Sequence, residues 1–177
     1  IHRAVRVPVG GAYIGKQEIF SIDFAQLRDG QAFTGDGSRP EDWFGFGAEI
    51  LAVADGTIVA IQEGYPEQVP LQPITQITRP QDFGGNSIIL EIAPGVFAYY
   101  GHLQPDSITV AVGDQVTTGQ VLALLGNTGN SSGPHLHFGL VDHPDPMLGL
   151  SLPMVFDQWA LQGTFDLAAY EATDDGD

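Results

Sequence analysis

The chain has 177 residues, a length typical of one domain that buries a substantial core. Its 22 acidic residues outnumber its 6 basic ones, and the resulting net charge of −16 makes nucleic acid and anionic membranes unfavourable partners. The sequence has no cysteine, which excludes disulfides, thiolate zinc ligands and a cysteine nucleophile.

The apolar runs and the composition near the two ends indicate how the chain is organised. The longest purely apolar runs have about five residues, whereas a membrane-spanning helix needs roughly 20, so we expect no transmembrane segment in this chain. The first residue is Ile1 rather than methionine, which predicts a trimmed or processed chain. We expect a single domain over residues 1–171 and a disordered acidic tail over residues 172–177.

Strand signals follow one another along the chain. The 23 glycines and 12 prolines are typical of short strands joined by tight turns. We predict two hairpins, the first joining residues 50–54 to 57–61 around Asp-Gly, and the second joining 87–92 to 96–100 around Pro-Gly. Further strands are predicted over residues 4–9, 107–110, 121–125 and 135–141.

Two segments lack any strand or helix pattern. Residues 62–83 carry four prolines between strand signals and are predicted to form a long loop, a length that often serves function. Residues 28–43 form a second irregular stretch. No segment sustains a helical period for three turns. The predicted fold class is therefore mostly β, a small antiparallel sheet or sandwich core with long loops.

Two histidines alternate with apolar residues in the segment Gly-Pro-His-Leu-His-Phe. Residues i and i+2 of a strand point to the same face, so His135 and His137 should converge while Leu136 and Phe138 enter the core. Imidazole is a zinc ligand and a proton shuttle, which predicts a functional site here. Chance placement of two histidines on a polar strand face is an equally good interpretation of this pair alone. The glycine-rich residues 127–133 are predicted to present His135 to a groove.

His102 and Asp23 are further candidates for this site. His102 follows a strand signal and a glycine, which suits the rim of a cleft, but a surface histidine with a backbone contact is the simpler interpretation. Asp23 lies in an apolar, aromatic run, where an unpaired carboxylate is costly and needs a metal, a cation or hydrogen-bond donors. An exposed aspartate on an edge strand is the alternative. The sequence leaves open whether Trp43 and Phe44 line a groove or pack inside.

These residues stand in an ordered series of motifs that resembles the lysostaphin-type zinc endopeptidases, also called LytM domains. The motifs are Ile-Asp-Phe-Ala (22–25), Ala-Val-Ala-Asp-Gly-Thr-Ile (52–58), Gly-Asn-Ser-Ile-Ile-Leu (85–90), Tyr-Gly-His-Leu (100–103), Val-Gly-Asp-Gln-Val (112–116), Gly-Gln-Val-Leu (119–122), Gly-Asn-Thr-Gly (126–129) and Gly-Pro-His-Leu-His-Phe (133–138). The resemblance implies the fold of that family, a small antiparallel β core described as a duplicated hybrid motif, with a groove.

The resemblance also implies the chemistry of the site. In this family zinc is held by the histidine and aspartate of a His-x-x-x-Asp motif and by the second histidine of His-x-His. Asp23 matches the aspartate and His137 matches that histidine, while His102 and His135 match two catalytic histidines that do not bind the metal. Zinc polarises the peptide carbonyl, and the imidazoles take the proton of water and stabilise the oxyanion. The implied partner is peptidoglycan or a cell-wall peptide, outside the cytoplasm of a bacterium.

One position departs from the family motif, because Ile19 stands where the first zinc-binding histidine belongs. A catalytic zinc normally has three protein ligands, and Asp23 and His137 supply only two. The conceivable replacements lie nearer the N-terminus and are His2, Gln17 and Glu18.

Two functions therefore remain open from the sequence. The first is a zinc-dependent endopeptidase-like domain that acts on peptidoglycan peptides, with activity weakened or lost through Ile19. The second is a catalytically degenerate module that binds or regulates partners in the cell envelope. The presence or absence of a third ligand near Asp23 distinguishes the two hypotheses.

Overall fold

The computed structural model describes residues 7–9, 12–14, 19–74, 77–145 and 148–157. His2, Gln17 and Glu18 lie outside the described residues, and so does the predicted tail over residues 172–177, so these expectations stay predictions. In the part of the chain that the structure describes, no helix is long and apolar enough to cross a membrane.

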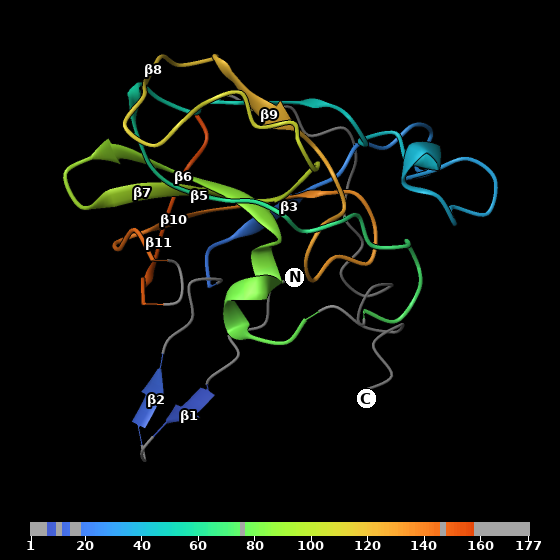
Figure 1. The fold of residues 1–177 in the computed structure, drawn as a ribbon, viewed down its shortest axis with the longest axis horizontal. Coiled ribbons are helices and arrows are strands. Elements are labelled where there is room, and N and C mark those ends of the chain that lie inside the picture. Colours follow the sequence, from blue (N-terminus) through green and yellow to red (C-terminus); the bar gives the residue numbers. More distant parts are fainter. Residues whose placement is uncertain (1–6, 10–11, 15–18, 75–76, 146–147, 158–177) are drawn as a thin grey trace.

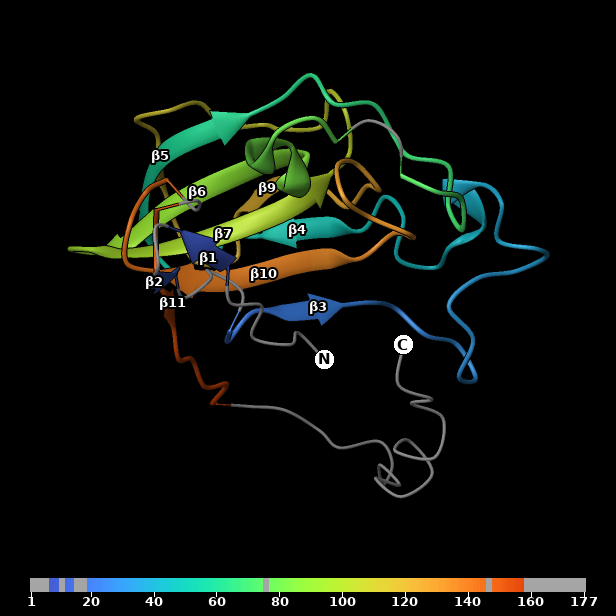
Figure 2. The ribbon, with the colours of Figure 1, turned by 90° about the horizontal axis from the view of Figure 1, so that it is seen from below.

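A sheet of seven strands forms the body of the molecule, and Figure 2 shows its central strands side by side. Strands β11, β10, β7, β6, β5 and β8 follow one another across it, and β3 pairs with the same edge of β10 as β11. All of these pairings are antiparallel. The strands are β3 (Ile22–Phe24), β5 (Gly56–Gln62), β6 (Asn86–Ala93), β7 (Val96–Leu103), β8 (Gln115–Val116), β10 (Leu136–Val141) and β11 (Ser151–Leu152).

Two smaller sheets accompany the large one. Strand β4 (Glu49–Leu51) pairs with β9 (Val121–Leu124), and β1 (Val7–Val9) pairs with β2 (Ala12–Ile14). The predicted strand over residues 4–9 is thus found at its described residues, 7–9, and there its partner is β2 rather than the strand that carries Asp23.

The main core fills the space between the large sheet and the β4–β9 pair, because its buried residues come from both. Side chains alternate across a strand, so the large sheet also buries residues on its opposite face. There a second cluster contains Ile89, Phe97, Tyr99 and Val141. The two members of the pair Tyr99 and Tyr100 therefore serve different faces, and Tyr100 belongs to the main core.

The predicted hairpin of β6 and β7 is confirmed. Both strands are buried along most of their length because both faces of the sheet are covered at this point. Gly95 in the turn has a φ of +74°, a left-handed conformation that glycine adopts without steric cost.

The predicted hairpin around Asp55 and Gly56 is wrong. Strand β4 pairs with β9, whereas β5 pairs with β6 and β8, so the two segments belong to different sheets. The Asp55 carboxylate accepts hydrogen bonds from the backbone N (2.7 Å) and the hydroxyl (2.9 Å) of Thr118. Asp55 and Gly56 therefore mark the point where the chain crosses from one sheet to another, rather than a two-residue turn. The hydrogen bonds to Thr118 attach this crossing to the loop between β8 and β9.

Residues 107–110, which the structure describes in full, do not form the predicted strand. Thr109 donates from its backbone N to the carbonyl of Leu122 (2.9 Å), but its hydroxyl binds the same carbonyl at 3.1 Å. The hydroxyl of Ser107 donates to the Gln104 carbonyl at 2.7 Å. Local bonds from hydroxyl side chains thus take the place of a regular ladder.

The two irregular segments are confirmed where they are described. The loop between β5 and β6 contains the short 3-10 turn η2 (Pro80–Gly84), and the earlier segment contains η1 (Pro40–Asp42). Figure 1 shows η2 as the green coil and η1 as the cyan coil. A mostly antiparallel β fold with long loops, as predicted from the sequence, is therefore confirmed.

Candidate functional site

Strands β3 and β10 place Asp23 directly opposite His137. His137 Nδ1 lies 3.0 Å from Asp23 Oδ1, and 41% of the Asp23 side chain is exposed. Val141, four residues after His137, belongs to the second cluster, so the pair occupies the sheet face opposite the main core. Phe138 is buried in the main core and Leu136 packs against it, as the alternation predicted.

His135 lies just before β10, and its ring turns toward the same carboxylate. Its Nε2 is 3.5 Å from Asp23 Oδ1. Its Nδ1 faces inward, 2.8 Å from the carbonyl oxygen of Gly133 and 3.2 Å from the hydroxyl of Ser131. His135 and His137 thus converge on one carboxylate oxygen, as the i, i+2 spacing predicted.

His102 reaches the site through a break in the pairing of β6 and β7. Between the pairs Asn86–Leu103 and Ile88–Tyr100, β7 carries one residue more than β6, which makes a β-bulge. His102 lies in this bulge with a left-handed φ of +63°, a conformation uncommon outside glycine and concentrated at functional sites. The bulge turns the imidazole into the protein, where it is buried.

The His102 imidazole completes a cluster of three rings. Its centroid lies 4.7 Å from that of His135 and 5.9 Å from that of His137. Burial, and then the two neighbouring imidazoles, lower the pKa of His102 to about 3, so the ring is neutral at physiological pH. Its Nδ1 lies 2.7 Å from the Thr128 carbonyl oxygen, which can only accept, so Nδ1 carries the proton. The other nitrogen, Nε2, is therefore unprotonated.

Asp23 and His137 are the two predicted metal ligands. Carboxylate oxygen and imidazole nitrogen are ordinary zinc ligands, so the pair suits zinc in kind. In number it does not, because among the described residues no group of three or more His, Cys, Asp or Glu side chains could hold a metal ion. Ile19 lies in a turn before β3, is 43% exposed and offers no donor atom. The described donor set is one ligand short of a catalytic zinc site.

Trp43 holds one side of the loop over residues 126–134, which precedes β10. Its indole lies directly on Gly133, where a Cβ would overlap the ring. Phe44 packs differently, beneath the guanidinium of Arg28, which lies 4.4 Å from the centre of the phenyl ring. Trp43 thus packs on the segment before β10 and Phe44 on Arg28, and both aromatic side chains are partly buried.

The long loop over residues 62–83 holds the other side of the same segment. Gln68 N donates to the carbonyl of Asn127 at 2.9 Å, and Asn130 N donates to the carbonyl of Phe83 at 2.8 Å. The segment that presents His135 is thus clamped between the two irregular parts of the chain.

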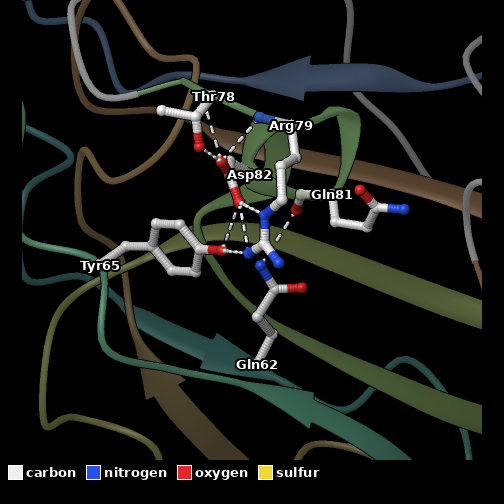
Figure 3. A network of polar contacts seen from close by, with 6 residues as sticks. All are labelled: Gln62, Tyr65, Thr78, Arg79, Gln81 and Asp82. Atoms are coloured by element: carbon white, nitrogen blue, oxygen red, sulfur yellow. Dashed lines mark hydrogen bonds and ion pairs between the residues drawn. The ribbon is translucent and has the colours of Figure 1, made fainter.

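A buried carboxylate, Asp82, fixes the end of the long loop (Figure 3). Its Oδ1 accepts from the hydroxyl of Tyr65 (2.8 Å) and from Arg79 Nη2 (2.9 Å), and its Oδ2 accepts from the hydroxyl of Thr78 (2.8 Å). The hydrogen bonds from Tyr65, Arg79 and Thr78 hold the pKa of Asp82 well below its usual range. The carboxylate is therefore charged and fully bonded at neutral pH.

Gly84, at the end of η2, connects this network to the site. A Cβ at Gly84 would overlap the hydroxyl of Tyr99, so the close approach of η2 to the sheet requires glycine. The Tyr99 ring lies 5.9 Å from that of His137. The long loop therefore supports the sheet face that carries the imidazoles.

Sequence reasoning identified the four titratable side chains and missed the groups that hold them. Thr128 and Gly133 act through backbone carbonyls, which no residue type signals. Ser131 and Asn127 are buried in a segment that the sequence predicts only as a glycine-rich loop. That glycine-rich pattern is the one signal that points to these supports.

Comparison with known proteins gives several matches. Peptidoglycan DD-endopeptidase ShyA of Vibrio cholerae is 31% identical over 106 residues, which are 59% of this chain and 24% of that protein. Murein hydrolase activator EnvC of Escherichia coli is 31% identical over 110 residues, 58% of this chain and 21% of that protein. The chain therefore spans a quarter or less of the length of these relatives. A zinc-containing peptidase structure from Vibrio cholerae is 27% identical to this chain, with a TM-score of 0.43. The match covers 60% of this chain and 26% of that one.

A family model also matches the chain. The model of peptidase family M23 matches residues 42–147, a range that contains His102, His135 and His137 and begins after Asp23. This range is more than half of the chain. The chain therefore belongs to peptidase family M23.

Proposed function

We propose that this chain is an endopeptidase domain that acts on the peptide part of bacterial peptidoglycan, outside the cytoplasm. The observation that carries the proposal is the pair His102 and His135, each of which places Nδ1 against a backbone carbonyl, while Nε2 of His135 faces the carboxylate of Asp23. Membership of a peptidase family and the name of the Vibrio cholerae relative, a peptidoglycan DD-endopeptidase, support this choice of substrate.

The two imidazoles can handle the proton that hydrolysis moves. Neutral His102 can accept a proton from water at Nε2 because its Nδ1 proton is already committed to the Thr128 carbonyl. The ring of His135, with its centroid 4.7 Å away, is close enough to act on the same peptide group. The proton taken from water is returned to the leaving nitrogen of the cleaved peptide, which leaves His102 neutral again.

Zinc is part of this proposal, although the described donor set is one ligand short. Asp23 and His137 would hold it together with a third ligand outside the described residues, for which His2, Gln17 and Glu18 are the candidates. When bound, zinc supplies Lewis-acid polarisation of the peptide carbonyl and a bound water of lowered pKa.

Metal content and hydrolysis test the proposal together. The full chain is purified without a histidine tag, mixed with one equivalent of zinc, desalted and measured by elemental analysis, then assayed on muropeptides. We expect about one zinc per chain and release of shorter peptides. The His137→Ala variant should retain no zinc. Bound zinc without hydrolysis of a broad panel of muropeptides contradicts the proposal.

A second function is favoured by one observation, the aliphatic Ile19 at the position of the missing ligand. In that case the domain binds peptidoglycan or a partner protein without cleaving it, and it is notable that the Escherichia coli relative is named a murein hydrolase activator. The same experiment separates the two functions. No retained zinc and no hydrolysis, together with co-sedimentation with purified sacculi, support the binding module.

A further inference from the structure

Behind His135 lies a short chain of buried polar groups that the proposed chemistry does not use. The hydroxyl of Ser131 lies 3.2 Å from His135 Nδ1 and 2.6 Å from Asn127 Oδ1. The amide Nδ2 of Asn127 lies 3.0 Å from the carbonyl oxygen of Gln68. Ser131 is 1% exposed and Asn127 is fully buried, so water does not substitute for these bonds.

The direction of every hydrogen bond in this row of polar groups is determined by the group farthest from His135, the carbonyl of Gln68. The Gln68 carbonyl can only accept, so Asn127 must turn Nδ2 toward it and Oδ1 toward Ser131. Oδ1 can also only accept, so the Ser131 hydroxyl donates its one proton away from His135. The other neighbour of that hydroxyl, the Gly133 carbonyl at 2.9 Å, likewise only accepts.

His135 Nδ1 is therefore left facing two acceptors, the Ser131 oxygen and the Gly133 carbonyl. Two acceptors on one ring nitrogen favour a proton on Nδ1, independently of the proton on Nε2, which faces the carboxylate of Asp23. They also limit rotation of the ring, which fixes the direction of Nε2 toward Asp23, 3.5 Å away.

The geometry points to Ser131 and Asn127 as positioning residues that set the orientation of the His135 ring and help to hold a proton on its Nδ1. This inference rests on the proposed function for its effect on catalysis, but the positioning itself does not require turnover. Gln68, the last member of this row of hydrogen bonds, belongs to the long loop between β5 and β6. That loop therefore acts on the imidazole without touching it.

A second contact from the same loop strengthens the arrangement. Glu67, next to Gln68, accepts a hydrogen bond at Oε2 from the backbone N of Asn127. Glu67 also forms a bridge of backbone pairing with Thr128, whose carbonyl binds His102. Glu67 and Gln68 thus hold Asn127 and Thr128. These two residues in turn position His135 and His102.

Imidazole nitrogen NMR of the full chain tests the inference directly. Two-bond nitrogen–proton correlation spectra are recorded on the wild type and on Ser131→Ala, with His135 assigned from a His135→Asn variant. In the wild type we expect a protonated His135 Nδ1 and a proton on it that exchanges slowly with water. In Ser131→Ala that proton should exchange at least about tenfold faster, because one of its two acceptors is gone. The His102 signal, which depends on the Thr128 carbonyl, should not change.

Ser132→Ala is the matched control, because Ser132 is the next residue and its side chain is exposed. It should leave both imidazole signals as in the wild type. With an active enzyme, Ser131→Ala should lower kcat roughly tenfold at unchanged KM, and Ser131→Thr, which keeps the hydroxyl, should recover part of the loss.

Two outcomes overturn the inference. One is a wild-type His135 whose Nδ1 carries no proton, a result that is measured on the wild type alone. The other is a Ser131→Ala variant whose His135 signals match those of the wild type. An inactive wild-type chain contradicts the proposed function instead, and the spectra still decide the positioning role.

Discussion

His102 and His135 each rest an inner nitrogen on a backbone carbonyl, whereas Asp23 lies on an edge strand with 41% of its side chain exposed. His102 and His135 form the enclosed half of the site, because two loops and the sheet surround them. Asp23 and His137 form the open half, which needs a further ligand from outside the described residues to hold zinc. The comparison teaches that the two halves, although Asp23 contacts both, are held by different parts of the chain, so that the exposed half can change while the imidazoles keep their backbone contacts.

The enclosed half is tested most severely by His135→Ala. Hydrolysis of muropeptides should fall by about 10²- to 10⁴-fold, the usual contribution of a positioned acid or base. The assay compares initial rates with His143→Ala, a histidine in a surface turn that should leave the rate unchanged. Equal rates for the wild type and His135→Ala would remove His135 from the mechanism.

The open half is tested by restoring the missing ligand with Ile19→His. Because a third protein donor completes a catalytic zinc site, we expect zinc to be held at least about tenfold more tightly and hydrolysis to rise in parallel. Competition with a zinc chelator measures the affinity. The control is Phe20→His, which places imidazole at the neighbouring exposed position. Similar gains from both variants would mean that the effect is not specific to the motif position.

The contact between the two loops of the enclosed half is tested by Gly133→Ala. A Cβ at this position would overlap the Trp43 indole, so we expect a loss of about 1–3 kcal/mol in the free energy of unfolding. Urea denaturation measures the loss. In a Trp43→Ala background the same substitution should cost much less, since the obstructing ring is gone. An equal cost in both backgrounds would place the strain elsewhere.

The smallest expected effect is a pH dependence of stability from Glu67. Burial raises the pKa of Glu67 from 4.5 to about 7, so the folded protein holds this proton more tightly than the unfolded chain. The contribution to stability is therefore complete below about pH 4.5 and is lost as the pH rises toward 7. Glu67→Gln, which cannot ionise, should gain stability relative to the wild type between pH 5 and pH 8.

Denaturation curves at both pH values measure this gain. Glu63→Gln, at an exposed position of the same loop, should show a difference from the wild type that does not change with pH. A gain of the same size in both variants would assign the effect to overall charge rather than to Glu67.

The sequence was sufficient for the parts of the molecule that depend on alternation. The spacing of His135 and His137 predicts one shared face, and the apolar runs of β6 and β7 predict their hairpin, because period and turn chemistry are local properties. Asp55 shows where this reasoning fails. Its carboxylate binds Thr118, a residue remote in sequence, and an Asp-Gly pair that reads as a hairpin becomes a crossing between sheets.

The supports of the site escape prediction for a different reason. The bulge that turns His102 inward depends on the register between β6 and β7, which only pairing of the full strands determines. The acceptors of both imidazoles are main-chain carbonyls of Thr128 and Gly133, which are invisible as residue types. Whether a third metal ligand exists depends on His2, Gln17 or Glu18, outside the described residues.

The carbonyl acceptors have a consequence for how such a domain changes over generations. A point substitution can delete a metal-binding side chain in one step, but it cannot delete the carbonyl oxygen of Thr128 or Gly133, because every amino acid carries one. The acceptors of the two imidazoles, though not the imidazoles themselves, thus persist through point substitutions. A lineage in which the metal-binding side chains change therefore still inherits the backbone acceptors that orient the two rings beside the carboxylate of Asp23.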